Sequence, residues 1–380
     1  MNEFVASLPS PESISLPESD PILHGLLILA FLVHALFMNL VVGGTLVTVM
    51  TDAIGIVTTR RHYQELAATL AHWLPGFLGV AVVLGILPLV FVQILYGPLF
   101  TPLVNGFGEI WIWAITMAVL GYGGLYGYKN WRSWLGDRPG LLLGLGFLSG
   151  IMFLIVALMF VAASVLFLNP DRWVIIQQGS FWNVFSLPSL IPRFGHLILA
   201  AVAGMGIFLV GYGLFLGFGS QGSTGDEPKE RYATWVIRYG VAWTLTGTLP
   251  QIVVGPWLLL SLPEFVRADL VSGQNLGSIA FFLGLTAGLL SLVLLNAALM
   301  VPQARGLAIG GTLSLMVTIC LMVIVRHAVR VSWLSPQFGT AALATQDQWN
   351  VAFIVGTMLL VILGLSVFMV RAYKKTRAYQ

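Results

Sequence analysis

Three histidines lie within or at the edges of long apolar runs, where an ionisable side chain is rare. His34 is about a dozen residues into the run that follows Pro21, His196 begins another run, and His327 ends a third. An imidazole at hydrocarbon depth must find a partner, and a metal ion is among the best partners available to it. The three positions therefore predict iron ligands in a haem protein of the membrane.

Each of these histidines also has an interpretation without a metal. His34 would then pack between helices and form a hydrogen bond with a neighbouring Ser or Thr, and His196 would be an unligated residue near the interface. Arg326 precedes His327 and Arg330 follows it, and the three residues would form an interfacial cationic cluster. In the haem hypothesis, Arg326 and Arg330 instead neutralise propionates, because a guanidinium matches paired carboxylate oxygens.

Two further residues have alternative roles that the sequence leaves open. His24 points about 80° away from His34 around a helix and lies about 15 Å nearer the surface. It is either an iron ligand opposite His196 or a residue of the first turn at the lipid headgroups. Glu109 either stabilises a helix N-terminus or accepts a proton, as a membrane carboxylate of raised pKa would.

Composition indicates an integral membrane protein. Of 380 residues, 58% are hydrophobic and 9% are charged, against about 25% charged in soluble domains. The basic residues that give the net charge of +3 fall at the ends of apolar runs, so nucleic acid is not an expected partner. A single cysteine, Cys320, excludes a disulfide framework and the two-cysteine attachment of c-type haem. Any haem is therefore expected to be b-type and held without covalent bonds.

Hydropathy predicts an all-α bundle of about nine transmembrane helices, each long enough to cross a hydrocarbon core of about 30 Å. The predicted spans are 22–50, 67–98, 109–130, 141–168, 194–219, 233–260, 276–300, 306–328 and 349–371. Arginine and lysine gather in alternate connections and in the C-terminal tail, so the N-terminus is expected outside and the C-terminus in the cytoplasm. His34, His196 and His327 then all fall in the outer half of the membrane.

The chain is expected to have three parts. Residues 1–21 form an outer N-terminal segment, 22–371 a transmembrane haem-binding helical domain, and 372–380 a basic cytoplasmic tail. Residues 1–21 lack the basic start of a cleaved signal peptide.

Five segments match, in order, the pattern of one membrane family. The first has His34 at the start of H-x-L-F-x-x-L-x-x-G, and the fifth contains Arg193-Phe194-Gly195-His196. The segments are 34–43, 78–97, 109–127, 149–170 and 193–204. The chain therefore resembles the cytochrome bd quinol oxidase subunit I superfamily, as a divergent member, well over residues 30–220 and thinly beyond. The resemblance implies that His196 is the axial ligand of a low-spin haem and that Glu109 is a membrane carboxylate.

The chain also departs from that family at several positions. Met117 stands where the family has a second carboxylate, and Gly284 falls in the segment that supplies an axial methionine. Counting back from Trp333 and Arg330, His327 replaces a carboxylate haem ligand. The hydrophilic quinol-binding loop is reduced to 261–275. Strong imidazole ligands on both sides close the iron and favour electron transfer over oxygen reduction.

The resemblance and its departures together imply a b-type cytochrome with two or three haems that oxidises quinol near the outer face. Electrons would pass to an outer haem or iron-sulfur protein, beside a second membrane subunit, in the cytoplasmic membrane of a prokaryote. One alternative is a bd-type terminal oxidase that reduces oxygen. Another is a haem-free membrane anchor of a redox complex. The direction of electron flow and a role for His72 stay open.

Overall fold

The computed structural model describes residues 21–135, 138–178, 181–218, 227–301 and 305–335. Within these ranges the chain is helical and contains no strand, which confirms the predicted all-α membrane class. The predicted outer segment and the basic tail lie outside the described residues, apart from Pro21. The predicted ninth span, 349–371, lies outside them as well.

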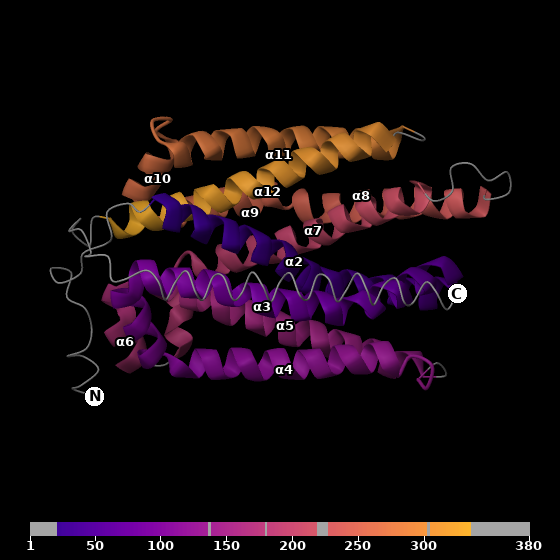
Figure 1. Ribbon diagram of the computed structural model, residues 1–380, viewed down its shortest axis with the longest axis horizontal. Coiled ribbons are helices and arrows are strands. Elements are labelled where there is room, and N and C mark those ends of the chain that lie inside the picture. The colour runs from indigo at the N-terminus through magenta and orange to yellow at the C-terminus, as the bar shows by residue number, and fades with distance from the viewer. Residues whose placement is uncertain (1–20, 136–137, 179–180, 219–226, 302–304, 336–380) are drawn as a thin grey trace.

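Long helices run side by side along one direction (Figure 1). They are α2 (Pro21–Thr58), α3 (Arg61–Gly106), α4 (Gly108–Asn130), α5 (Pro139–Phe167), α7 (Leu190–Phe218), α8 (Glu227–Thr248), α11 (Leu276–Met300) and α12 (Arg305–Leu334). Shorter pieces are η1 (Pro170–Arg172), α6 (Trp173–Gln178), η2 (Phe181–Ser186), α9 (Gln251–Leu260) and α10 (Glu264–Val271). Of the described helices, all the long ones except α8 are long and apolar enough to cross a membrane, seven in number.

The predicted span 233–260 is divided in two by Pro250. The ring of a proline clashes with the preceding turn and leaves a carbonyl without its amide partner. Accordingly α8 ends at Thr248 and α9 begins at Gln251. The division matters for the site, because it places the Gln251 side chain beside α7.

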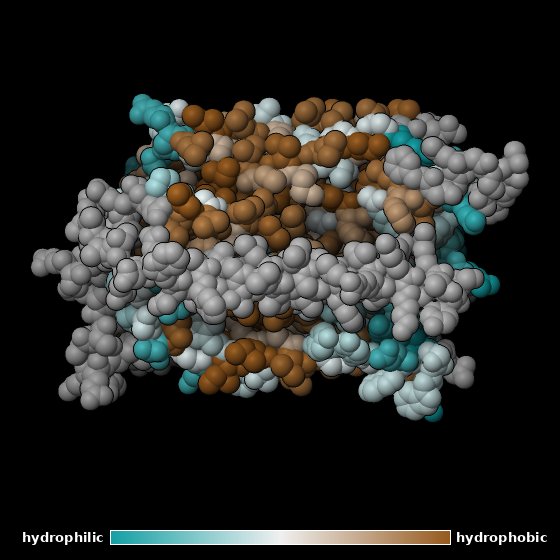
Figure 2. All heavy atoms as spheres, viewed as in Figure 1, coloured by the Kyte–Doolittle hydropathy of each residue, from teal (hydrophilic) through white to brown (hydrophobic). Residues whose placement is uncertain are grey.

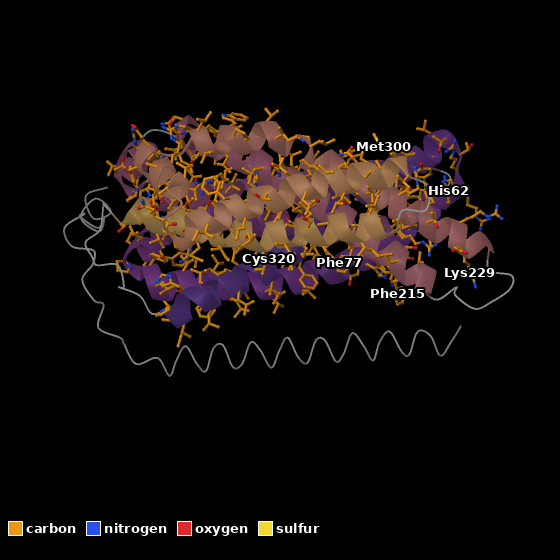
Figure 3. The ribbon with its side chains drawn as sticks, turned by 90° about the horizontal axis from the view of Figure 1, so that it is seen from above. His62, Phe77, Phe215, Lys229, Met300 and Cys320 are labelled. Atoms are coloured by element: carbon orange, nitrogen blue, oxygen red, sulfur yellow. The ribbon has the colours of Figure 1, made fainter. Side chains whose placement is uncertain are left out.

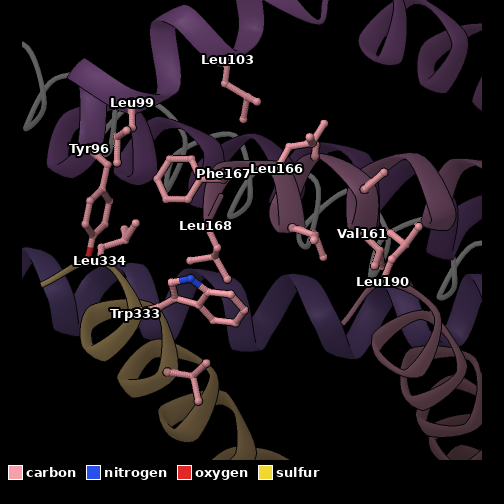
Figure 4. Close-up of a cluster of buried hydrophobic side chains, with 14 of the residues drawn as sticks. Tyr96, Leu99, Leu103, Val161, Leu166, Phe167, Leu168, Leu190, Trp333 and Leu334 are labelled. Atoms are coloured by element: carbon pink, nitrogen blue, oxygen red, sulfur yellow. The ribbon is translucent and has the colours of Figure 1, made fainter. Parts of the chain in front are cut away.

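Helix α3 spans 46 residues and contains four prolines, and it bends at Tyr96, where φ is −136° and ψ is 31°. Pro98 follows two residues later and cannot donate to the carbonyl one turn before it. The bend brings the buried Tyr96 ring towards the end of α12, near Leu334 (Figure 4). The surrounding cluster also holds Phe167 and Trp333, so one core joins α3, α5 and α12.

Small residues allow α7 and α8 to pack closely. A Cβ at Gly240 would lie 2.7 Å from the backbone nitrogen of Val210, and one at Gly206 would lie even closer to the backbone nitrogen of Thr244. Such contacts are how membrane helices associate when lipid offers no hydrophobic driving force.

The two ends of the bundle are polar and its middle is apolar (Figure 2). His62, Lys229 and Met300 lie towards the same end (Figure 3). This basic end carries the connections that the charge pattern predicts to be cytoplasmic. The start of α2 and the end of α12 lie at the opposite end, called here the outer end (Figure 1).

A buried ion pair fixes α2 near the basic end. Asp52 is 1% exposed, accepts a hydrogen bond of 2.7 Å from the Tyr128 hydroxyl, and pairs with Arg132 Nη2 at 2.5 Å. A buried carboxylate needs such partners to offset its lost hydration.

We expect Arg132→Gln to lower the free energy of unfolding by about 3 kcal/mol, because it leaves Asp52 buried without a cation. Thermal unfolding of the detergent-solubilised chain measures the loss. Arg61→Gln is the matched control, since the Arg61–Glu65 pair is exposed and such pairs are worth about 0–1 kcal/mol. Equal melting temperatures for the two variants would contradict the expectation.

Candidate functional site

The outer ends of α2 and α12 bring two of the predicted histidines together. The ring centroids of His24 and His327 are 4.9 Å apart, in an edge-to-face arrangement. The ring centroids of His24 and Tyr96, a residue of α3, are 6.3 Å apart. His24 therefore packs on His327, although it starts α2 and is more than 300 residues away in the sequence.

The two arginines beside His327 lie over aromatic rings. The Arg326 guanidinium is 3.9 Å from the ring centroid of Phe31, and that of Arg330 is 5.7 Å from the ring of Tyr96. Cation–π contact compensates part of the hydration that a guanidinium loses on burial. It leaves the N–H groups at the guanidinium edge available to an anion.

His34 lies farther along α2 than His24, and it packs against α3. Its Nδ1 lies 3.0 Å from the carbonyl oxygen of Ala81, and since a carbonyl only accepts, Nδ1–H donates. A neutral imidazole then carries its lone pair on Nε2. The ring packs against Gly85, where an added Cβ would be 2.8 Å from His34 Cε1. This fixed tautomer and orientation are what a metal-ligating histidine requires.

His196 lies in the first two turns of α7, between Arg193 and α9. Gln251 Nε2 donates a 3.0 Å hydrogen bond to the His196 carbonyl oxygen, which ties α9 to α7 at this point. His196 Nδ1, Arg193 Nε and His327 Nδ1 are buried without a hydrogen-bond partner among the described residues. Buried polar atoms are normally paired, so unpaired ones point to a group not contained in this part of the chain.

Charge joins these residues into one site, called here the outer cationic cluster. Arg326 lies within electrostatic range of His34, Arg193, His327 and Arg330, and Arg193 within range of His196. The outer cationic cluster comprises His24, His34, Arg193, His196, Arg326, His327 and Arg330. None of its arginines has a carboxylate partner among the described residues. Half-buried cations without counter-ions in a membrane bundle are costly, so the cluster fits an anionic ligand.

Glu109 lies apart from this cluster in the described contacts. It is exposed in the first turn of α4, flanked by Phe107 and Ile110. These two neighbours belong to the same buried core as Trp333 of α12, so Glu109 is at the outer end. Its predicted role as a proton acceptor stays a prediction.

The residues fit haem better than a multidentate metal site. Among the described residues, no group of three or more His, Cys, Asp or Glu is arranged to hold a metal ion. Haem needs only one or two axial side chains, supplied here by histidines with unpaired nitrogens, and cations for its propionates. His34, His196 and His327 would hold the iron, and Arg326 and Arg330 the carboxylates.

Four residues near the site escaped the sequence analysis as contributors. Arg193 stood in the motif before His196, and its charge inside an apolar run was the available signal. Tyr96 and Gln251 gave none. Met322 is the fourth, and its side chain packs on Gly284, where an added Cβ would be 2.6 Å from its Cε. A thioether therefore lies beside Gly284.

Comparison with known proteins supports the fold. No protein-family model matches the chain, and no curated protein matches it. A chain of the bd oxidase from Geobacillus thermodenitrificans superposes with a TM-score of 0.73 at 13% sequence identity, covering 93% of this chain and 98% of that one. This likeness shows a shared fold.

Proposed function

We propose that this chain is a membrane b-type cytochrome that oxidises quinol near the outer face and passes the electrons to a partner protein. The observation that carries the proposal is the outer cationic cluster. Three arginines and four histidines converge at one end of a membrane bundle, with no carboxylate partner for the arginines among the described residues. Haem supplies both missing elements, since its propionates are anionic and its iron takes imidazole nitrogen.

Each residue has a separate task in this proposal. His34 presents Nε2 because Nδ1–H is held by Ala81. Arg326 and Arg330 bind carboxylate oxygens and remain oriented by the rings beneath them. Haem, when bound, supplies reversible one-electron transfer. His327, in place of a carboxylate ligand, favours a closed coordination shell at the iron. A closed shell in turn favours electron transfer over oxygen binding.

Quinol oxidation requires a proton acceptor as well as an electron acceptor. Each quinol gives up two protons and two electrons as it becomes quinone. Glu109 is exposed at the outer end of α4, where its carboxylate can accept a proton from quinol and release it to the outer solvent. The electrons leave one at a time to an outer haem or iron-sulfur protein, assembled beside a second membrane subunit in the cytoplasmic membrane of a prokaryote.

The test is a pyridine haemochrome assay on the purified full-length chain, together with its reduced optical spectrum. We expect two or three b-type haems per chain, with low-spin bands only and no carbon monoxide shift. Reduction of these bands by a soluble quinol would show the electron entry. A purified chain with no Soret band would overturn the proposal in favour of a haem-free anchor.

A second candidate function is favoured by the fold comparison. The bd oxidase chain matches nearly the whole length of this one, which supports a terminal oxidase with oxygen bound at the His34 haem. A high-spin or chlorin-type haem that binds carbon monoxide would decide for this candidate.

A further inference from the structure

A second cationic site lies at the basic end, between α8, α11 and α12. It is a small, partly open pocket, lined by Arg238, Arg305 and Thr234 on its polar side and by Ile237, Val241 and Ala298 among its apolar residues.

The charges of the pocket are not balanced by the described residues. Arg305 Nη2 donates to Glu230 Oε1 at 3.0 Å and to Thr234 Oγ1 at 3.3 Å. Arg238 Nη2 donates to the carbonyl oxygen of Leu299 at 2.9 Å, in the last turn of α11. A carbonyl satisfies one N–H but does not neutralise the charge. Two arginines against one glutamate leave a net positive pocket.

An apolar stripe leads away from Arg305 along α12. Ile309, Leu313 and Val317 follow it at intervals of four residues and are 37%, 60% and 51% exposed. Residues four apart lie on one face of a helix, and twelve residues extend about 18 Å. Among the described residues, this face offers an apolar surface that starts at the Arg305 guanidinium and is long enough to contact a hydrocarbon chain.

We propose that this pocket binds the phosphodiester of an anionic phospholipid, with one acyl chain along the stripe of Ile309, Leu313 and Val317. Arg238 and Arg305 hold the phosphate oxygens through charge-assisted hydrogen bonds. Thr234 adds a hydroxyl. Basic pockets between membrane helices on the cytoplasmic side are suited to anionic headgroups, and the charge pattern predicts that side for this end. The site is independent of the haem proposal.

The experiment measures thermal unfolding of the purified full-length chain in neutral detergent, titrated with phosphatidylglycerol, phosphatidylcholine or inorganic phosphate. We expect phosphatidylglycerol to raise the melting temperature and the other two to have little effect. Arg238→Gln should weaken the apparent affinity for phosphatidylglycerol about tenfold, as expected when a charged hydrogen-bond donor is lost. Leu313→Asn should weaken it as well, because the lipid loses apolar contact.

The controls separate this site from general attraction to anionic lipid. Arg238→Lys keeps the charge and should bind within about threefold of the parent, whereas Arg61→Gln removes an exposed cation at the same end and should change nothing. The proposal is overturned if Arg238→Gln binds like the parent. It is equally overturned if inorganic phosphate stabilises the chain as well as phosphatidylglycerol does.

Discussion

His34→Ala is expected to remove one haem from the purified chain without preventing insertion into the membrane. The remaining residues of α2 are apolar enough to span it, so the loss is local. The imidazole is held in place by the Ala81 carbonyl, and alanine supplies no replacement donor. A pyridine haemochrome assay gives the change as one haem fewer per chain.

Two further variants sharpen this result. Gly85→Val keeps His34 but places a side chain where a Cβ alone would be 2.8 Å from the ring. It should therefore lower the content of the same haem. His72→Ala removes a histidine outside the outer cationic cluster and should leave the haem content unchanged. Full haem content in His34→Ala would refute the ligand assignment.

His196→Ala tests whether the histidines serve different irons. His196 lies in α7 beside Arg193, and none of the described contacts joins its ring to that of His34. We therefore expect the two alanine variants to lose different haems, distinguishable by their optical bands. Loss of the same single haem from both would instead make them opposite ligands of one iron.

His327→Glu is expected to lower the midpoint potential of one haem by roughly 100 mV, since axial ligands move haem potentials over about 0.8 V. A carboxylate adds negative charge, which stabilises the ferric state, and its weaker field shifts the iron towards high spin. Arg326 and Arg330 lie near the position in sequence and in charge range, so the substitution introduces a carboxylate among cations and should not impair folding. Redox titration with optical detection measures both effects.

The haem assigned to His196 is the internal control for this variant and should keep its potential. His24→Gln separates the packing contact from the charge, because it changes the ring that packs on His327 without introducing a carboxylate. A His327→Glu chain whose spectrum and titration match the parent would make His327 a neighbour of the interfacial cations only.

The sequence alone was sufficient for the membrane class and for most of the helices. Apolar runs of 20 or more residues leave the backbone no alternative to the helix in hydrocarbon, and both His34 and His196 fell in such runs. The charge pattern likewise placed the basic connections at one end, where the structure has His62 and Lys229. These features depend on local composition, which can be read from the sequence without knowledge of the tertiary structure.

Tertiary structure decided which of these residues meet. His24 and His327 are separated by about 300 residues, and only the crossing of α2 and α12 brings their rings to 4.9 Å. Tyr96 reaches the same place because α3 bends there, and Gln251 reaches α7 because Pro250 divides a predicted single span. Hydropathy varies little around α2, so it does not reveal which face of that helix packs on α12. That choice depends on close contacts such as Gly85 with His34, which exist only once the bundle has assembled.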